Sequence, residues 1–107
     1  MIEKLLEAIA ADPTNPFYKY GIAIEYRNSG EADKAMKYFS EVHDNAPEYL
    51  PNYFHYGQLL VDFEELQQAQ SIFEEGIKLA KRQGNSHALA ELQGSLSALL
   101  ESENLNS

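Results

Sequence analysis

The stretch that decides the fold runs from Tyr53 to Phe73 and reads YFHYGQLLVDFEELQQAQSIF. One repeat period earlier, residues 19–39 show the same skeleton as KYGIAIEYRNSGEADKAMKYF. Small residues and aromatic residues recur at the same offsets in both stretches. The period is 34 residues, as from Phe39 to Phe73. A fixed period of this length, with two helical segments in each period, is typical of repeat proteins built from stacked helical hairpins.

Helical periodicity predicts six helices, and the sequence marks most of their ends. Proline suits the first turn of a helix and glycine the position after its last turn, so Pro16, Pro51, Gly30 and Gly84 mark starts and stops. The expected helices span residues 2–11, 16–28, 31–45, 51–62, 65–83 and 86–101. No segment alternates apolar and polar residues with a period of two, so we expect no sheet.

The two repeats differ at the turn between their helices. The first repeat breaks at Ser29-Gly30, whereas the second breaks at Phe63-Glu64 and has no glycine. If this turn needs a left-handed residue, a side chain there costs up to ~1 kcal/mol.

The charge of the chain narrows the classes of partner. Its 107 residues include 17 acids against 8 bases, for a net charge of −9, and no Lys or Arg occurs between Tyr38 and Ile77. Nucleic acids and anionic membranes are therefore unexpected partners, whereas a basic peptide would be attracted. The acidity also fits a simpler purpose, which is to keep a small protein soluble.

Several other properties are defined by what the sequence lacks. The chain has no cysteine, so neither a disulfide framework nor a thiolate metal site is expected. Its apolar runs are too short to span a bilayer, and its first residues do not resemble a signal peptide. A cytoplasmic location is the default expectation.

The repeated residues resemble the tetratricopeptide repeat family, whose pattern is Trp-x2-Leu-Gly-x2-Tyr, then Ala-x3-Phe, then Pro. The first unit matches this pattern at Ile22, Ala23, Tyr26, Ala35, Phe39 and Pro47. The second unit matches it at Tyr53, Tyr56, Gly57, Leu60, Ala69 and Phe73. Lys19 stands where the pattern has its first aromatic residue, and Lys81 stands where it has the proline.

This resemblance implies an all-α fold, a right-handed α-solenoid of antiparallel helix hairpins. The expected layout is one domain over residues 1–101, with repeats at 16–49 and 50–83, capping helices at 2–11 and 86–101, and a frayed tail at 102–107. One hairpin cannot bury its apolar stripe alone, so neighbouring hairpins must stack. With only two full units, both capping helices must contribute to the core.

The resemblance also implies a concave groove, lined by the first helix of each pair, that holds a peptide or a partner protein. A turn of about 100° per residue places a second stripe beside the core positions of these helices. The groove candidates are Phe17, Tyr20, Ile24, Arg27 and Asn28 on one helix and Phe54, Gln58, Val61 and Asp62 on the other. Their apolar members exceed what the core requires, and exposed apolar patches usually mark interaction surfaces. The alternative is that these side chains simply meet each other or the last helix.

The chemistry of these positions suggests the kind of segment that they hold. Some members of the family grip a C-terminal carboxylate with Lys, Arg and Asn, but this stripe offers only Arg27, Asn28 and Gln58, opposed by Asp62. An apolar or basic segment therefore fits better. A homodimer that uses the same patch, or an end of the stack, is the main alternative.

An enzyme is a remote alternative, either a small hydrolase or a metal-dependent one, and we expect no cofactor and no metal. His87 and Glu91 are four residues apart and could share a helix face, but a third ligand is missing. A catalytic function would need a polar pocket in which His43, His55 or His87 meets carboxylates.

Overall fold

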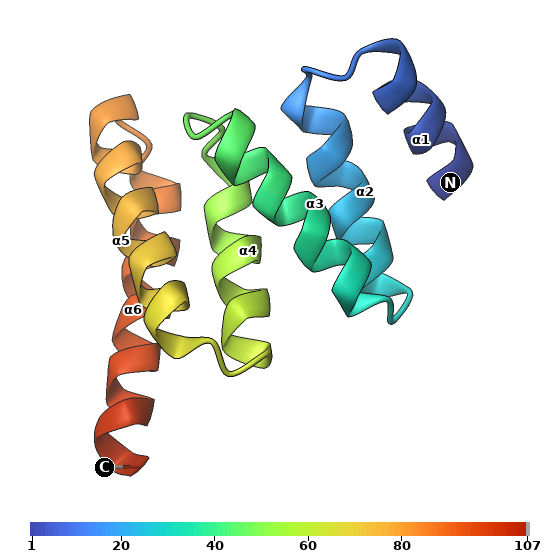
Figure 1. Cartoon of the computed structure of the whole chain (residues 1–107). Coiled ribbons are helices and arrows are strands. Elements are labelled where there is room, and N and C mark those ends of the chain that lie inside the picture. Colours follow the sequence, from blue (N-terminus) through green and yellow to red (C-terminus); the bar gives the residue numbers. More distant parts are fainter. Residues whose placement is uncertain (107) are drawn as a thin grey trace. The chain divides into compact units, whose positions relative to one another are not determined.

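The computed structural model describes the backbone of residues 1–106 and the side chains of residues 1–104, and it shows six helices joined by short turns (Figure 1). The helices are α1 (Ile2–Ala11), α2 (Pro16–Asn28), α3 (Ala32–Asn45), α4 (Pro51–Asp62), α5 (Leu66–Gln83) and α6 (Ser86–Asn106). No strand occurs among the described residues, and the expected all-α class is confirmed.

The helix ends follow the sequence signals except at the end of the chain. Asn15 caps α2, because its side chain accepts a hydrogen bond from the Phe17 backbone N–H, and Pro16 is the first helical residue. The expected end of α6 at Glu101 is wrong, since the helix continues to Asn106. Residues 102–106 contain neither glycine nor proline, so nothing in them stops a helix. Ser107, the last residue of the expected frayed tail, lies outside the described residues.

The chain divides into two compact units, Met1–Asn52 and Tyr53–Ser107. In the first unit α2 packs against both α1 and α3, and in the second unit α5 packs against α6. The division falls within α4, so it does not coincide with the repeat boundaries expected at residues 16, 50 and 83. Those boundaries, and a single domain over residues 1–101, stay predictions.

The repeat positions on α2 and α3 supply much of the core of the first unit. Its buried residues on these helices are Ile22, Ala23, Tyr26, Ala35, Phe39 and Val42. Ala35 and Phe39 are both 0% exposed. A small residue next to a large one lets the helices approach while the ring fills the remaining space. On the other side of α2, the Leu5 Cδ2 atom would lie 3.6 Å from a Cβ added at Gly21, so α1 also packs closely.

The second unit uses glycine to bring its helices together. The Phe73 ring lies so close to Gly57 that a Cβ added at Gly57 would overlap it. A Cβ added at Gly76 would lie 2.8 Å from Tyr53 Cβ on α4 and 3.0 Å from Leu92 Cδ1 on α6. Gly76 therefore marks the place where α5 passes between α4 and α6.

The turn between α2 and α3 is centred on Gly30, whose φ is 83°. The Gly30 N–H donates to the Arg27 carbonyl at 3.2 Å, and the Glu31 N–H donates to the Tyr26 carbonyl at 2.8 Å. This pair of bonds satisfies the last carbonyls of α2, and it requires a left-handed residue at position 30.

The turn between α4 and α5 has the same bonds at the equivalent positions of the second repeat. The Glu64 N–H donates to the Val61 carbonyl at 2.9 Å, and the Glu65 N–H donates to the Leu60 carbonyl at 2.9 Å. Glu64 takes the left-handed position with a φ of 60°. The second turn therefore needs the left-handed conformation, which is costly for a residue with a side chain.

Candidate partner-binding site

The groove candidates on α2 differ in how far they reach solvent. Phe17, in the first turn, is 59% exposed, and its ring meets that of Tyr18 edge-on at 5.7 Å. Tyr20, Ile24 and Arg27 are half-buried. Asn28, at the last position of α2, is exposed.

Tyr20 also has a structural role within the first unit. Its ring lies edge-on to that of Tyr49 at 5.5 Å and to that of Phe39 at 6.5 Å. Such edge-on pairs are favourable by about 0.5–1.5 kcal/mol beyond the area that they bury. Burial raises the pKa of Tyr49, so its hydroxyl stays neutral well into the alkaline range. Tyr20 is therefore held in a defined position and is not a loose surface ring.

The groove candidates on α4 are similarly half-buried, except for Asp62, which is exposed. The Phe54 ring lies edge-on to the His55 ring at 5.2 Å. The Gln58 side-chain amide donates to the Ser95 hydroxyl of α6 at 3.1 Å. This hydrogen bond joins the amide to the last helix, a contact of the kind that the alternative interpretation of the groove candidates expects.

The expected patch is less exposed than the sequence suggested. Tyr20, Ile24, Phe54 and Val61 were expected to be exposed, but each is half-buried. Tyr20 on α2 and Phe54 on α4 nevertheless occupy equivalent positions in the two repeats, and both rings are half-buried. The sequence thus overestimates the accessibility of these four side chains, and their role as a binding surface stays a prediction.

The histidines give no support for a catalytic or metal site. His87 Nε2 lies 3.8 Å from Glu91 Oε2, but the His87 side chain is 87% exposed. His43 Nδ1 lies 3.8 Å from the neighbouring Asp44 Oδ1. Over the described part of the chain, no three His, Cys, Asp or Glu side chains gather in a way that could hold a metal ion.

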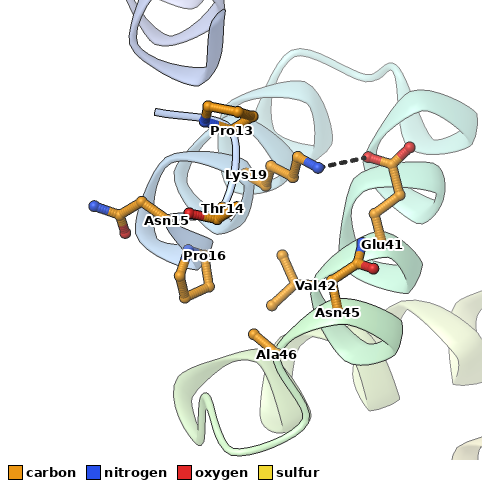
Figure 2. A pocket seen from close by; sticks show the side chains of 9 residues that line it. All are labelled: Pro13, Thr14, Asn15, Pro16, Lys19, Glu41, Val42, Asn45 and Ala46. Carbon is orange, nitrogen blue, oxygen red and sulfur yellow. Dashed lines mark ion pairs between the residues drawn. The ribbon is translucent and has the colours of Figure 1, made fainter. Parts of the chain in front are cut away.

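The first unit also has a pocket of about 400 Å³ that the sequence analysis missed (Figure 2). It lies between the segment that leads into α2 and the last turns of α3, and it is lined by Pro13, Thr14, Asn15, Pro16, Lys19, Glu41, Val42, Asn45 and Ala46. An ion pair of 3.8 Å between Lys19 Nζ and Glu41 Oε2 spans its rim. One signal in the sequence was Lys19, which departs from the aromatic residue of the family pattern.

Comparisons with known proteins place the chain among solved structures. No protein-family model matches it, and a search of curated proteins gives no match. The tetratricopeptide repeat domain of a protein from Salinibacter ruber is 29% identical, with 87% of this chain and 94% of that one covered and a TM-score of 0.81. None of the helices in residues 1–106 is long and apolar enough to cross a bilayer.

Two further structures show the same fold at lower identity. PcrH, solved in complex with the chaperone-binding region of PopD, is 17% identical, with 95% of this chain and 77% of that one covered and a TM-score of 0.86. The first tetratricopeptide repeat domain of Spaghetti (RPAP3), bound to the HSP90 peptide SRMEEVD, is 21% identical, with 99% and 78% covered and a TM-score of 0.80. The buried repeat positions, the repeated turn and these matches show that the chain has the fold of tetratricopeptide repeat domains.

Proposed function

We propose that this chain is a protein-interaction module that binds a peptide, or a segment of a partner protein. The proposed binding residues lie on α2 and α4, the first helix of each repeat. The observation that carries the proposal is the pair Tyr20 and Phe54, two half-buried rings at equivalent repeat positions. Aromatic side chains that are partly covered and fixed in position are typical anchors for a partner. PcrH and the RPAP3 domain, which have the same fold, were both solved with a bound protein segment.

The charge of the chain favours an apolar or basic segment. Asp62 is exposed at the end of α4, and the chain has no Lys or Arg between Tyr38 and Ile77. Its net charge of −9 attracts a basic segment over a distance of about one Debye length, ~8 Å at physiological salt. Arg27 is the only cation among the groove candidates, so a carboxylate-terminated peptide would find little charge complementarity.

Peptides selected from a random displayed library against the purified chain provide the probe for a direct test. The Phe54→Ala variant should weaken the binding of a selected peptide by about tenfold, which corresponds to ~1.4 kcal/mol. Arg27→Glu should strengthen the binding of a basic peptide and weaken that of an acidic one. Fluorescence anisotropy measures these affinities.

Phe63→Ala is the matched control, because Phe63 is 39% exposed in the turn after α4 and lies outside the groove candidates. It should bind the selected peptide as the unchanged chain does. Equal affinity for Phe54→Ala, Arg27→Glu and the unchanged chain would reject α2 and α4 as the binding surface.

A second candidate function is the pairing of two copies, and one observation favours it. Helix α1 buries none of its residues 2–11 fully, and Leu6 is 41% exposed on it. A net charge of −9 on each copy opposes such pairing. Light scattering over a hundredfold range of concentration decides the question. A dimer that Leu6→Lys dissociates supports it, and a constant monomer mass rejects it.

A further inference from the structure

The pocket of the first unit corresponds to a filled position in the second unit. Two of its lining residues, Lys19 and Val42, have their counterparts one repeat later at Tyr53 and Gly76. In the second unit these counterparts touch, since a Cβ added at Gly76 would lie 2.8 Å from Tyr53 Cβ and 3.1 Å from Tyr53 Cγ. Tyr53 is only 3% exposed, so its ring fills the interior there.

A second pair of equivalent positions shows the same difference. Asn45 lines the pocket and is exposed, whereas Leu79, its counterpart in the second repeat, is 4% exposed. Protein interiors are packed at crystal-like density, so the loss of a ring and a leucine leaves a space of a size that side chains normally fill. Val42 is larger than Gly76 and takes part of this space, so the pocket is what remains where the first unit lacks the ring and the leucine.

The walls of the pocket suit an aromatic ring that carries a hydrogen-bond donor. Val42 and Ala46 are buried and present apolar surface, and the rings of Pro13 and Pro16 lie at its edge. Figure 2 shows the Lys19 side chain reaching from α2 toward Glu41 on α3, with Val42 and Ala46 below them in this view.

The ion pair at the rim supplies two kinds of polar contact. An ammonium group such as that of Lys19 is attracted to the face of an aromatic ring. The Glu41 carboxylate can accept a hydrogen bond from a phenol O–H or an indole N–H, the polar groups that Tyr and Trp must satisfy when they are buried. A plain hydrocarbon ring would leave this acceptor unused.

We propose that the pocket binds the side chain of a Tyr or Trp residue of a partner protein, which would lie beside Val42 in the space between Lys19 and Asn45. The pocket lies wholly within Met1–Asn52. It does not depend on the binding faces of α2 and α4 proposed above, so the two proposals can fail separately.

The probe is 4-methylphenol, a small-molecule analogue of the tyrosine side chain, which is added to the full ¹⁵N-labelled chain. Saturable shifts of the backbone amides of Thr14, Lys19 and Asn45 are expected in two-dimensional NMR spectra. Toluene, which lacks the hydroxyl, should bind several-fold more weakly. The tripeptide acetyl-Gly-Tyr-Gly-amide should shift the same amides, whereas its Gly-Ala-Gly analogue should not.

Lys19→Tyr gives the decisive comparison, because it restores the residue type of the second unit. Its ring competes for the pocket, so the variant should weaken the binding of 4-methylphenol by at least about tenfold. Lys4→Tyr is the matched control, since Lys4 is exposed on α1 and does not line the pocket. It should bind 4-methylphenol as the unchanged chain does.

Three results would overturn the proposal. These are the absence of saturable shifts with 4-methylphenol, shifts that persist in Lys19→Tyr, and binding of the Gly-Ala-Gly tripeptide equal to that of the tyrosine one. If Lys19→Tyr does not fold, Asn45→Leu replaces it, because it fills the pocket with the residue type found at Leu79 and carries the same expectation.

Discussion

The two units make the same turn and the same helix pairing but place glycine at different points. In the first unit glycine occupies the left-handed turn position, at Gly30, and alanine occupies the close-packed helix position, at Ala23. In the second unit glycine occupies the close-packed helix position, at Gly57, and Glu64 occupies the left-handed turn position. The two turns therefore share one hydrogen-bonding pattern and one left-handed position, although glycine takes that position in one and glutamate in the other.

The largest effect is expected at the close-packed position of the second unit. Gly57→Ala adds the methyl group that the first unit has at Ala23, but here the group would overlap the buried Phe73 ring. Overpacking of this kind typically costs about 1–3 kcal/mol. The free energy of unfolding, measured by urea denaturation, should fall by this amount.

Gly94→Ala is the control for that substitution. Gly94 lies within α6, and a Cβ added there would meet no atom within 4 Å. The change should therefore stabilise the chain by about 0.5–1 kcal/mol through the higher helix propensity of alanine. If Gly57→Ala stabilised the chain as Gly94→Ala does, the two units would share one packing distance and the comparison would fail.

A smaller change in the free energy of unfolding is expected at the left-handed turn position of each repeat. Glu64→Gly should stabilise the chain by up to ~1 kcal/mol, because glycine adopts a φ of 60° without steric cost. Gly30→Ala should destabilise it by a similar amount, since alanine would have to take a φ of 83°. Urea denaturation of both variants measures the difference. A loss of stability in Glu64→Gly would mean that the glutamate side chain itself supports the turn.

The smallest effect concerns tyrosines of the first unit at high pH. Burial first, and then Tyr26 and Glu41, raise the pKa of Tyr38, and burial raises the pKa of Tyr49. An unfolded tyrosine ionises near pH 10, and these two ionise later in the folded state. Their contribution to stability is therefore full below about pH 10 and is lost as the pH rises through the folded pKa.

Phenylalanine at these two positions removes that dependence. Between about pH 8 and pH 11, the free energy of unfolding should fall less for Tyr38→Phe and Tyr49→Phe than for the unchanged chain. Urea denaturation at both pH values makes the comparison. An unchanged slope in both variants would show that neither tyrosine limits stability in alkali.

Most of the fold could be predicted from the sequence because its signals are local and repeated. Pro16 and Pro51 begin helices, Gly30 and Gly84 end them, and the constant repeat period fixes which alanine and phenylalanine meet. The end of α6 could not be placed, because residues 102–106 contain no residue that stops a helix.

The candidate site was predicted less completely. Helical geometry selects Tyr20 and Phe54, but it cannot tell how much of each ring is covered, because a neighbour such as Tyr49 reaches Tyr20 from a distant position on the chain. The pocket beside Lys19 was missed for a related reason. A residue that departs from a repeat pattern shows where a ring is absent, but only coordinates show whether neighbouring side chains have closed the space.

The buried Asn52 has a consequence for the uniqueness of this fold. Its side-chain N–H donates to the Phe39 carbonyl at 3.0 Å, while its Oδ1 atom has no partner among the described residues. A leucine there would avoid the cost of an unmatched oxygen. With asparagine, an arrangement in which α3 slides or rotates relative to Asn52 breaks the hydrogen bond to the Phe39 carbonyl. The buried amide would then be left unpaired, which costs free energy. Asn52 thus favours a single alignment of nearly interchangeable helices over the greatest possible stability.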